Sequence, residues 1–414
     1  MSGYLTKIKT KIPRTDKEVD IDVNGKTLIL TGGNGCGKTQ LLNFVYENLI
    51  DRVVNRNNKD VQRLKQEING YEQGMERDGP THKDYDIYTK LKKQAEEKIK
   101  ELESCLIKLS DLEHFIIKYK DLQSVLLQFE ASRKSDILKP SSVVSIDSLK
   151  NKDLETVSNR HQRITTSSIF EEFLLTSIAN QAFSESKKIN DDQLEAERID
   201  KWFNKLETDL QKLFEDEELK LVFKSDSFSF EIHQKHKEPY TFQSLSSGFS
   251  SIMAIYADLI TKVSLRAIDP EELTGIVMID EIDAHLHVSL QKKILSFLTS
   301  AFPNVQFIVT THSPFVVSSV KDAVIYDLSK LEQVEDLSMY SYEAVLEGLF
   351  GVLPISELLQ QNIEALAELL ERRPIDLEQI QALLNQLPQD EDSLDSESLY
   401  FVNSAKLAIN KAKG

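Results

Sequence analysis

The stretch "GGNGCGKTQ", residues 32–40, follows the apolar run "TLIL" and decides the fold of this chain. It fits the phosphate-loop pattern Gly-x-x-x-x-Gly-Lys-Thr, with a strand expected before it and a helix after it. Glycines let backbone N–H groups curl around a β-phosphate, and the helix N-terminus adds partial positive charge. Lys38 can reach the β- and γ-phosphates, and the Thr39 hydroxyl can ligate Mg²⁺. The alternative, a plain glycine-rich turn, is disfavoured by Lys-Thr and by both flanks. The residues expected to bind nucleotide here are Gly32, Asn34, Gly35, Cys36, Gly37, Lys38, Thr39 and Gln40.

A pair of acidic residues, Asp280 and Glu281, ends the apolar run "GIVMIDE". Such a run is typical of a buried parallel strand, and ligands bind at the carboxyl edge of such sheets. We expect Asp280 to hold Mg²⁺ through water, and Glu281 to take a proton from the attacking water or to orient it. A solvated acidic pair is the alternative, but the phosphate loop in the same chain makes it the weaker interpretation.

Two further segments have weaker meaning when each is taken alone. "SLSSGFSS", residues 244–251, places a serine-glycine turn before a helix, where N–H groups and the Ser246 hydroxyl can bind phosphate or simply cap the helix. "FIVTTHSPF" places His312 just after a second buried strand, where it can face Glu281 and reach a γ-phosphate oxygen. A lone histidine there is more often structural, so the order of the segments has to decide.

That order resembles the ATP-binding-cassette (ABC) ATPase class: phosphate loop, helical insertion, serine-glycine signature, Asp-Glu strand, strand-His. "DEIDAHLHVSLQ" and "TTHSPF" are similar to a prokaryotic branch of SMC-like, AAA-family ATPases. That branch includes the overcoming-lysogenisation-defect (OLD) nucleases and the ATPase subunits of the Septu and PARIS antiphage systems. The resemblance covers about residues 20–50 and 240–330 and, less specifically, the helical tail.

The resemblance implies an ATPase that uses ATP and Mg²⁺ and forms a head-to-tail homodimer. The turn of one subunit would close on the ATP held by Lys38 of the other. The resemblance assigns Glu281 and His312 to catalysis, with His312 sensing the γ-phosphate, and Asp283 to the dimer seam. The turn residues that would contact ATP are Ser246, Ser247 and Gly248.

The chain departs from the family at the signature, because Ser247 replaces the first glycine and Phe249 replaces Gln or Glu. We therefore expect slow turnover without loss of nucleotide binding. The family's glutamine loop has no assigned position, and Gln123, Gln162 and Gln181 are its candidates. The i, i+2 spacing of His285 and His287 is poor for a shared metal site.

Composition limits the class of protein. The chain has 414 residues, 40% hydrophobic and 28% charged, and a formal charge of −17. Such a chain can form a sizeable core, and it lacks the basic field of a dedicated nucleic-acid binder. Its two cysteines suggest a reducing compartment, and no run approaches a membrane span of about 20 apolar residues. We expect a cytoplasmic protein with no membrane partner.

The expected fold is α/β: an ABC-type P-loop ATPase head with a β-rich lobe, a helical-hairpin insertion and a helical C-terminal extension. The head takes residues 1–50 and 140–350, the insertion 51–139 and the extension 351–414. Asn24-Gly25 predicts a type I′ hairpin within 19–30, and "SSVVSI", residues 141–146, a strand. Heptad-like spacing predicts two coiled-coil-like helices, the second running from Leu91 to Tyr119. Whether they project from the head or pack flat on it stays open.

The first functional hypothesis is an ATPase subunit of a two-component antiphage system, which scaffolds and regulates a separate effector. The effector chemistry is expected to come from another chain, because the helical tail shows no strand-ending carboxylate cluster. The resemblance to the OLD nucleases implies that this effector is a nuclease. The alternative is an SMC- or RecF-like repair ATPase that clamps DNA, so DNA stays open as a partner. The nucleotide subunit of a transporter ranks third, since the expected coupling features are missing from the sequence.

Overall fold

The structure is a computed structural model that describes residues 4–55, 61–80, 82–104, 106–158, 165–335, 337–351, 355–372, 374–388, 390 and 394–413. The chain divides into two compact units, Met1–Met339 and Tyr340–Gly414. Among these residues no helix is long and apolar enough to cross a bilayer.

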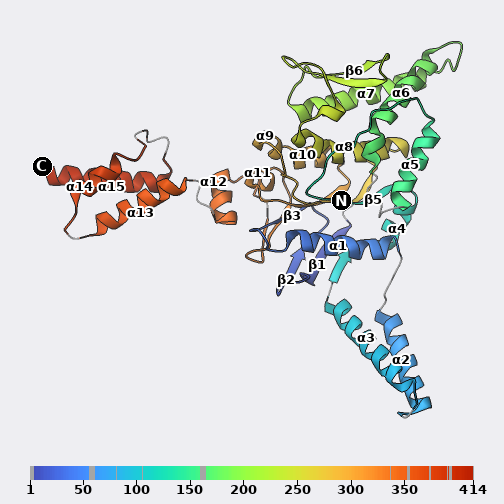
Figure 1. Ribbon diagram of the computed structural model, residues 1–414, viewed down its shortest axis with the longest axis horizontal. Coiled ribbons are helices and arrows are strands. Elements are labelled where there is room, and N and C mark those ends of the chain that lie inside the picture. Colours follow the sequence, from blue (N-terminus) through green and yellow to red (C-terminus); the bar gives the residue numbers. More distant parts are fainter. Residues whose placement is uncertain are drawn as a thin grey trace. The chain divides into compact units, whose positions relative to one another are not determined.

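A six-stranded sheet forms the centre of the first unit (Figure 1). In spatial order its strands are β12 (Glu332–Glu335), β11 (Val324–Asp327), β3 (Leu28–Thr31), β10 (Val305–Thr310), β9 (Thr274–Ile279) and β5 (Ser124–Phe129). All neighbours pair in parallel except β12, which is antiparallel to β11. Every residue of β3, β9, β10 and β11 is buried, as expected of a parallel sheet covered on both faces. The predicted α/β class and the strands around residues 275–279 and 305–310 are confirmed.

A three-stranded antiparallel sheet shares a core with helix α1 (Lys38–Val53). Its order is β2 (Glu18–Asp22), β1 (Leu5–Lys11) and β4 (Leu106–Leu109). The predicted pairing across Asn24-Gly25 is wrong, because β2 pairs with β1 and β3 belongs to the other sheet. Both turn residues do have positive φ, 54° and 75°. The turn is therefore present, but it carries the chain from one sheet to the next.

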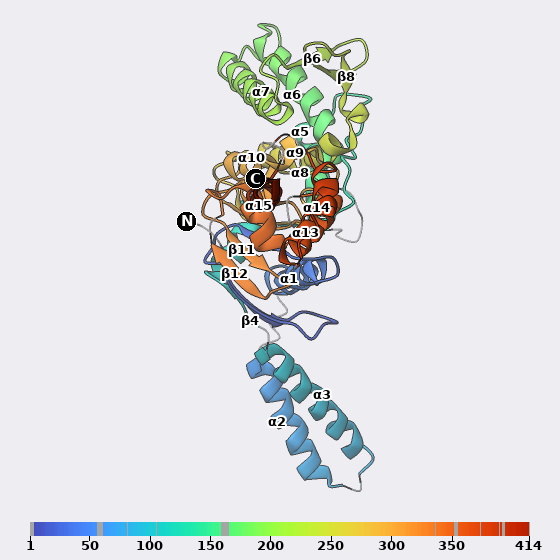
Figure 2. The same cartoon turned by 90° about the vertical axis from the view of Figure 1, so that its left-hand side faces the viewer.

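Helices α2 (Val61–Asp78) and α3 (Tyr85–Ser104) lie side by side (Figure 2). Tyr71 stacks on Tyr88, and Gly74 allows the close approach, since a Cβ there would lie 3.0 Å from the Tyr88 ring. The predicted helix to Tyr119 is wrong beyond Ser104, because the chain forms β4, then α4 (Leu112–Lys120), then β5. Apolar residues of β4 and α4 that fit the heptad spacing face the core of the head instead.

A second lobe covers the head around helix α8 (Ser247–Leu265). It contains α5 (Ile146–Ser158), η1 (Thr166–Ile169), α6 (Phe170–Glu185), α7 (Gln193–Phe214), β6 (Lys220–Lys224), β7 (Ser229–His233), β8 (Tyr240–Thr241) and η2 (Phe242–Ser244). β6 and β7 form an antiparallel hairpin. The predicted strand at 141–146 is wrong, since residues 141–145 form no strand and α5 begins at Ile146. Helices α9 (Val288–Gln291), α10 (Ile294–Ala301) and α11 (Pro314–Val317) complete the unit.

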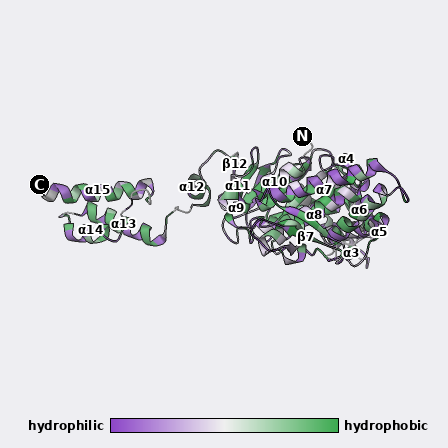
Figure 3. Cartoon of the chain, turned by 90° about the horizontal axis from the view of Figure 1, so that it is seen from above, coloured by the Kyte–Doolittle hydropathy of each residue, from purple (hydrophilic) through white to green (hydrophobic). Residues whose placement is uncertain are grey.

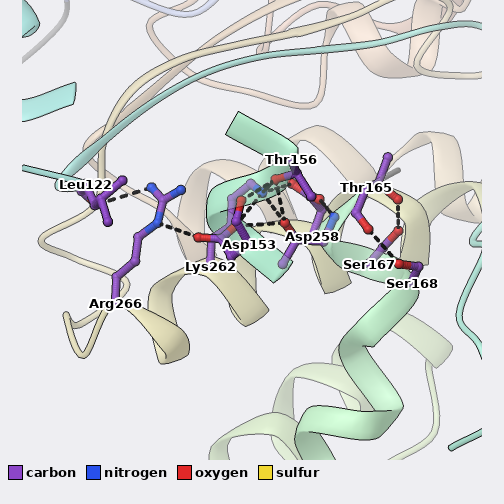
Figure 4. Close-up of polar contacts among 10 residues, drawn as sticks. Leu122, Asp153, Thr156, Thr165, Ser167, Ser168, Asp258, Lys262 and Arg266 are labelled. Carbon is purple, nitrogen blue, oxygen red and sulfur yellow. Dashed lines mark hydrogen bonds and ion pairs between the residues drawn. The ribbon is translucent and has the colours of Figure 1, made fainter. Parts of the chain in front are cut away.

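A buried ionic network fixes α8 to this lobe (Figure 4). The Lys262 Nζ lies 3.0 Å from Asp153 Oδ1 and 3.6 Å from Asp258 Oδ2, and the Arg266 Nε lies 3.1 Å from Asp153 Oδ2. These four side chains are 3–5% exposed. Lys262 also donates to Thr166 at the start of η1. We call Asp153, Asp258, Lys262 and Arg266 the closed network.

The second unit has a helical core of its own. Its elements are α12 (Tyr342–Val345), η3 (Leu346–Phe350), α13 (Glu357–Glu371), α14 (Leu377–Leu384) and α15 (Ser396–Lys413). Hydrophobic and hydrophilic residues alternate around α13 and α15 (Figure 3), and their apolar faces form one cluster. Helices α13 and α14 confirm the helices predicted for this tail, and the compact unit spans Tyr340–Gly414.

Candidate functional site

The phosphate loop, the Asp280-Glu281 pair and His312 meet at the carboxyl edge of the six-stranded sheet. β10 lies between β3 and β9, and all three strands run in parallel. The phosphate loop follows β3, Asp280 and Glu281 follow β9, and His312 follows β10. The carboxyl ends of adjacent parallel strands share one edge, so segments distant in the sequence form a single site.

The phosphate loop is compact around Lys38. The Lys38 side chain is 6% exposed, and its Nζ donates to the carbonyl oxygens of Gly32 (2.9 Å) and Gly33 (3.1 Å). Gly32 and Gly37 have φ values of 130° and 106°, which L side chains rarely adopt. The start of the loop is held by Ser329, whose Oγ accepts from Gly33 N at 2.8 Å. Helix α1 begins at Lys38, so its N-terminal N–H groups face the loop.

The two predicted Mg²⁺ ligands lie next to each other. The Thr39 hydroxyl donates to Asp280 Oδ2 at 2.8 Å, and Thr310 donates to the other carboxylate oxygen at 2.6 Å. A hydroxyl and a carboxylate oxygen at this spacing are the hard oxygen ligands that Mg²⁺ takes alongside water and phosphate. The residues present therefore fit a Mg²⁺ ion with its nucleotide.

Glu281 lies in a sharply turned backbone. Its φ is +43°, a left-handed conformation that costs a non-glycine residue about 1–2 kcal/mol. Its N–H donates to Thr310 Oγ1 at 2.7 Å, and its carbonyl oxygen accepts from Arg133 Nη2 at 3.2 Å. The surrounding structure thus holds the turn that directs the Glu281 side chain.

Asp283 and His312 complete the edge. Asp283 Oδ1 accepts from the Thr311 hydroxyl at 2.5 Å. Burial and the nearby Lys38 charge lower the pKa of His312 below its usual range, although three acidic neighbours oppose this. His312 is therefore neutral at neutral pH and can donate one ring N–H.

The signature turn begins α8. Ser246 and Ser247 are exposed, and the Ser246 side chain makes no capping hydrogen bond although it occupies the N-cap. Gly248 is buried, and a Cβ there would meet His285 O at 2.9 Å. The Phe249 ring stacks on Phe214 of α7 at 4.2 Å, so this departure from the family pattern has a packing role. Among the described residues, no hydrogen bond joins this turn to the phosphate loop of its own chain.

The glutamine at this edge is one that the sequence interpretation missed. Gln128 lies near the carboxyl end of β5, and its amide donates to Asn43 of α1. Gln123 precedes β5 at the opposite end, Gln181 lies on α6, and Gln162 falls outside the described residues. The sequence signal for this glutamine was the mostly apolar run "SVLLQF", which is typical of a buried parallel strand and carries Gln128 near its end.

Arg133, Thr310 and Ser329 were missed as well. All three act through hydrogen bonds to loop backbone or to Asp280, and no side-chain spacing announces such contacts. Their signal was only their position just after, or at the end of, the strands β5, β10 and β11.

His285 and His287 lie in the turn that leads into α9. His287 caps α9, with its Nδ1 accepting from Ser289 N at 3.4 Å. In the part of the chain that the structure describes, no cluster of three or more His, Cys, Asp or Glu residues is arranged to hold a metal.

Comparison with known proteins places the chain among ATPases. A family model described as "AAA domain, putative AbiEii toxin, Type IV TA system" matches residues 28–318. "Retron Ec83 probable ATPase" of Escherichia coli is 40% identical over 114 residues, 26% of this chain and 21% of that protein. "Septu protein PtuA" of Bacillus mycoides (strain KBAB4) is 35% identical over 136 residues, 32% of this chain and 18% of that protein. The aligned part is therefore about a fifth of each relative's own length.

One solved structure that is similar to this chain is described as "Crystal structure of the SmcHead bound to the C-winged helix domain of ScpA". Its identity is 12% and its TM-score 0.36, and the match covers 78% of this chain and 94% of that one.

Proposed function

This chain belongs to the family described as "AAA domain, putative AbiEii toxin, Type IV TA system", and from that premise we propose that it binds ATP with Mg²⁺ and hydrolyses it. The observation that carries the proposal is the 2.8 Å contact between Thr39 and Asp280. It joins the phosphate loop to the acidic strand end across 241 residues of sequence. Each of these two motifs is ambiguous alone, but their direct contact makes them parts of one site.

Each side chain has a defined task in this proposal. Lys38 exchanges the carbonyl oxygens of its own loop for the β- and γ-phosphates of ATP. Mg²⁺, held by Thr39 and Asp280, would neutralise charge on those phosphates. Glu281 orients the attacking water and accepts its proton, and neutral His312 donates its N–H to a γ-phosphate oxygen.

The functional form is a head-to-tail homodimer in which the signature turn of one copy meets the ATP of the other. Support comes from the exposed hydroxyls of Ser246 and Ser247 and from the Ser246 hydroxyl that caps nothing in its own chain. Asp283, two residues after Glu281, lies at the seam. ATP thereby stabilises a two-state interface that hydrolysis releases.

The role of the dimer is to hold and regulate a separate effector in antiphage defence, with a nuclease as the expected effector. The matches to a Septu protein and to a retron ATPase support this. The candidate docking surfaces are the α2–α3 hairpin, which we take as the insertion, and the Tyr340–Gly414 unit. Purification from the native host followed by mass spectrometry tests it: a stoichiometric nuclease is expected, and a preparation containing only this chain would contradict the scaffold role.

Hydrolysis by wild type and by Glu281→Gln tests the enzymatic proposal. The substitution keeps the shape of the side chain and removes its basicity, so the rate falls by about 10²- to 10⁴-fold. ATP affinity stays close to wild type, because Glu281 acts on water rather than on the phosphates. A phosphate-release assay and a fluorescent-ATP titration measure the two quantities.

The exposed Glu271→Gln serves as the matched control and leaves both quantities unchanged. Wild-type turnover in Glu281→Gln would remove Glu281 from its role. Absence of ATP hydrolysis in the wild-type protein together with its purified effector would overturn the ATPase assignment itself.

A further inference from the structure

Arg133 lies in the loop after β5, directly behind the turn that carries Asp280 and Glu281. Its side chain is buried, with the residue 8% exposed. Its Nη1 donates to the carbonyl oxygen of Asp280 at 2.7 Å, and its Nη2 donates to those of Glu281 at 3.2 Å and Ile282 at 3.0 Å. One rigid, planar side chain thus holds three consecutive peptide groups.

This arrangement is costly for a side chain with only a structural task. Arg133 forms no ion pair within the described residues, and its Nε is buried without a hydrogen-bond partner. The guanidinium is charged, because arginine stays protonated in proteins. A charge buried without a direct ion pair is expensive, so its position calls for a function.

The strained Glu281 backbone gives that function. A left-handed residue persists only where its surroundings enforce it. On one side Thr310 accepts from the Glu281 N–H, and on the other Arg133 fixes the carbonyl groups of residues 280–282. Without Arg133 these peptide groups can rotate, and the Glu281 carboxylate moves with them.

The same loop also reaches the signature turn. Ser135 N and Ser135 Oγ both lie 3.0 Å from Ser250 Oγ, in the first turn of α8. Ser250 N in turn donates to Ser246 O at 2.8 Å. Two residues on, Ile137 O accepts from Gln243 at 3.2 Å, just before the signature. A displacement of the start of α8 therefore also displaces residues 133–137, the loop whose Arg133 holds the Glu281 backbone.

We propose that Arg133 is a positioning residue for ATP hydrolysis, and that residues 133–137 couple the signature turn to Glu281. Arg133 fixes the backbone from which Glu281 acts and does not touch the nucleotide. Contact of the partner copy with the signature turn is transmitted through Ser250 and Ser135 to the hydrolytic residue. The inference rests on the ATPase function proposed above.

Arg133→Ala tests the positioning role by separating binding from hydrolysis. Fluorescent-ATP affinity stays within about threefold of wild type, because no phosphate contact is lost. Single-turnover hydrolysis falls about 10- to 100-fold, the cost of a misplaced catalytic group. Millimolar guanidinium chloride restores part of the rate by occupying the vacated site, whereas urea and sodium chloride do not. Loss of affinity equal to the loss of rate, or rescue by urea, would overturn the positioning role.

Arg133→Lys decides the question if the alanine variant does not fold. It keeps the charge but cannot span three carbonyl groups, so hydrolysis is intermediate between wild type and the Arg133→Ala expectation, with normal affinity. The matched control is Arg266→Lys, another buried arginine that donates to a backbone carbonyl, that of Leu122. Arg266→Lys lowers the melting temperature without changing the rate per folded molecule. A wild-type rate of ATP hydrolysis in Arg133→Lys would contradict the positioning role of Arg133.

A double-mutant cycle tests the coupling. Ser250→Ala slows hydrolysis in wild type, but it adds nothing in Arg133→Lys, because both changes break one path. Full additivity of the two effects contradicts the coupling. Failure of the inference and of the ATPase proposal are distinguishable. A wild type that hydrolyses ATP and loses this with Glu281→Gln upholds the ATPase, whatever the Arg133 variants do.

Discussion

Two buried polar clusters in the head use charge in opposite ways. In the closed network, Lys262 and Arg266 are paired directly with Asp153 (Figure 4). At the nucleotide edge, Lys38 and Arg133 donate to backbone carbonyl oxygens, and no ion pair of either occurs in the described part of the chain. The carboxylate of Asp280 accepts from hydroxyl groups instead.

The difference separates a structural cluster from a functional one. Charges that are paired with each other stabilise one arrangement and have no capacity left for a ligand. Charges held by carbonyl and hydroxyl groups keep that capacity, because a triphosphate and its Mg²⁺ offer far stronger partners. Removal of a charge from the first cluster should therefore cost stability, and removal from the second should cost function.

The largest expected effect belongs to the closed network. Lys262→Met leaves Asp153 and Asp258 buried with less compensation, which costs about 3–5 kcal/mol of unfolding free energy. Urea unfolding followed by circular dichroism measures it, and ATP hydrolysis per folded molecule should not change. The control Lys205→Met breaks a pair whose lysine is 45% exposed and costs less than about 1 kcal/mol. Equal losses of unfolding free energy in the two variants would show that the closed network stabilises the fold no more than a partly exposed ion pair does.

Lys38→Ala should show the reverse pattern. It removes the cation that meets the phosphates, so ATP affinity falls at least about 100-fold, or about 2.7 kcal/mol. Stability changes by only about 1 kcal/mol, since two hydrogen bonds to carbonyl groups are lost. Lys237→Ala is the control, because Lys237 also donates to an uncharged oxygen, the side-chain Oε1 of Gln234, in the segment after β7 and away from the loop. Retained ATP affinity in Lys38→Ala would contradict the claim that the charges at the nucleotide edge are available to bind the triphosphate.

The smallest effect is a pH dependence of Asp258. Burial raises its pKa above the ordinary value of 3.8, and its Oδ2 has no hydrogen-bond partner. A carboxyl group whose folded-state pKa is raised binds more protons in the folded protein, so its contribution to stability falls as the pH rises from 3.8 through the raised value. Relative to Asp258→Asn, wild type should lose stability over that window. Urea unfolding across a pH series checks this, and parallel curves would refute it.

The two clusters also differ in how far the sequence predicts them. Lys38, Thr39 and Asp280 lie in short local patterns next to apolar strands, so their meeting follows from parallel-sheet topology. Arg133 and Thr310 act on backbone groups or on a single oxygen across long sequence separations, and one sequence carries no trace of such contacts. The closed network could not be predicted either, since Asp153 and Lys262 lie 109 residues apart, on the separate helices α5 and α8.

The errors in the fold have a similar cause. Residues 106–116 fit a heptad spacing, yet β4 completes the edge of β1 and the α4 side chains join the core of the head. Asn24-Gly25 has the backbone of a hairpin turn without paired strands. In both places tertiary pairing overrides a local pattern that was read correctly.

Light scattering after gel filtration of Glu281→Gln tests the central claim most directly. With MgATP the slow variant should have the mass of a dimer, and without nucleotide that of a monomer. Ser246 is exposed, and its side chain makes no capping hydrogen bond in its own chain. Adding Ser246→Arg should therefore block the dimer contact and return the mass to that of a monomer, while ATP still binds. The control Ser225→Arg, on the exposed β6–β7 turn, should leave the dimer intact. An ATP-dependent dimer that Ser246→Arg does not disturb would contradict a nucleotide shared between two copies.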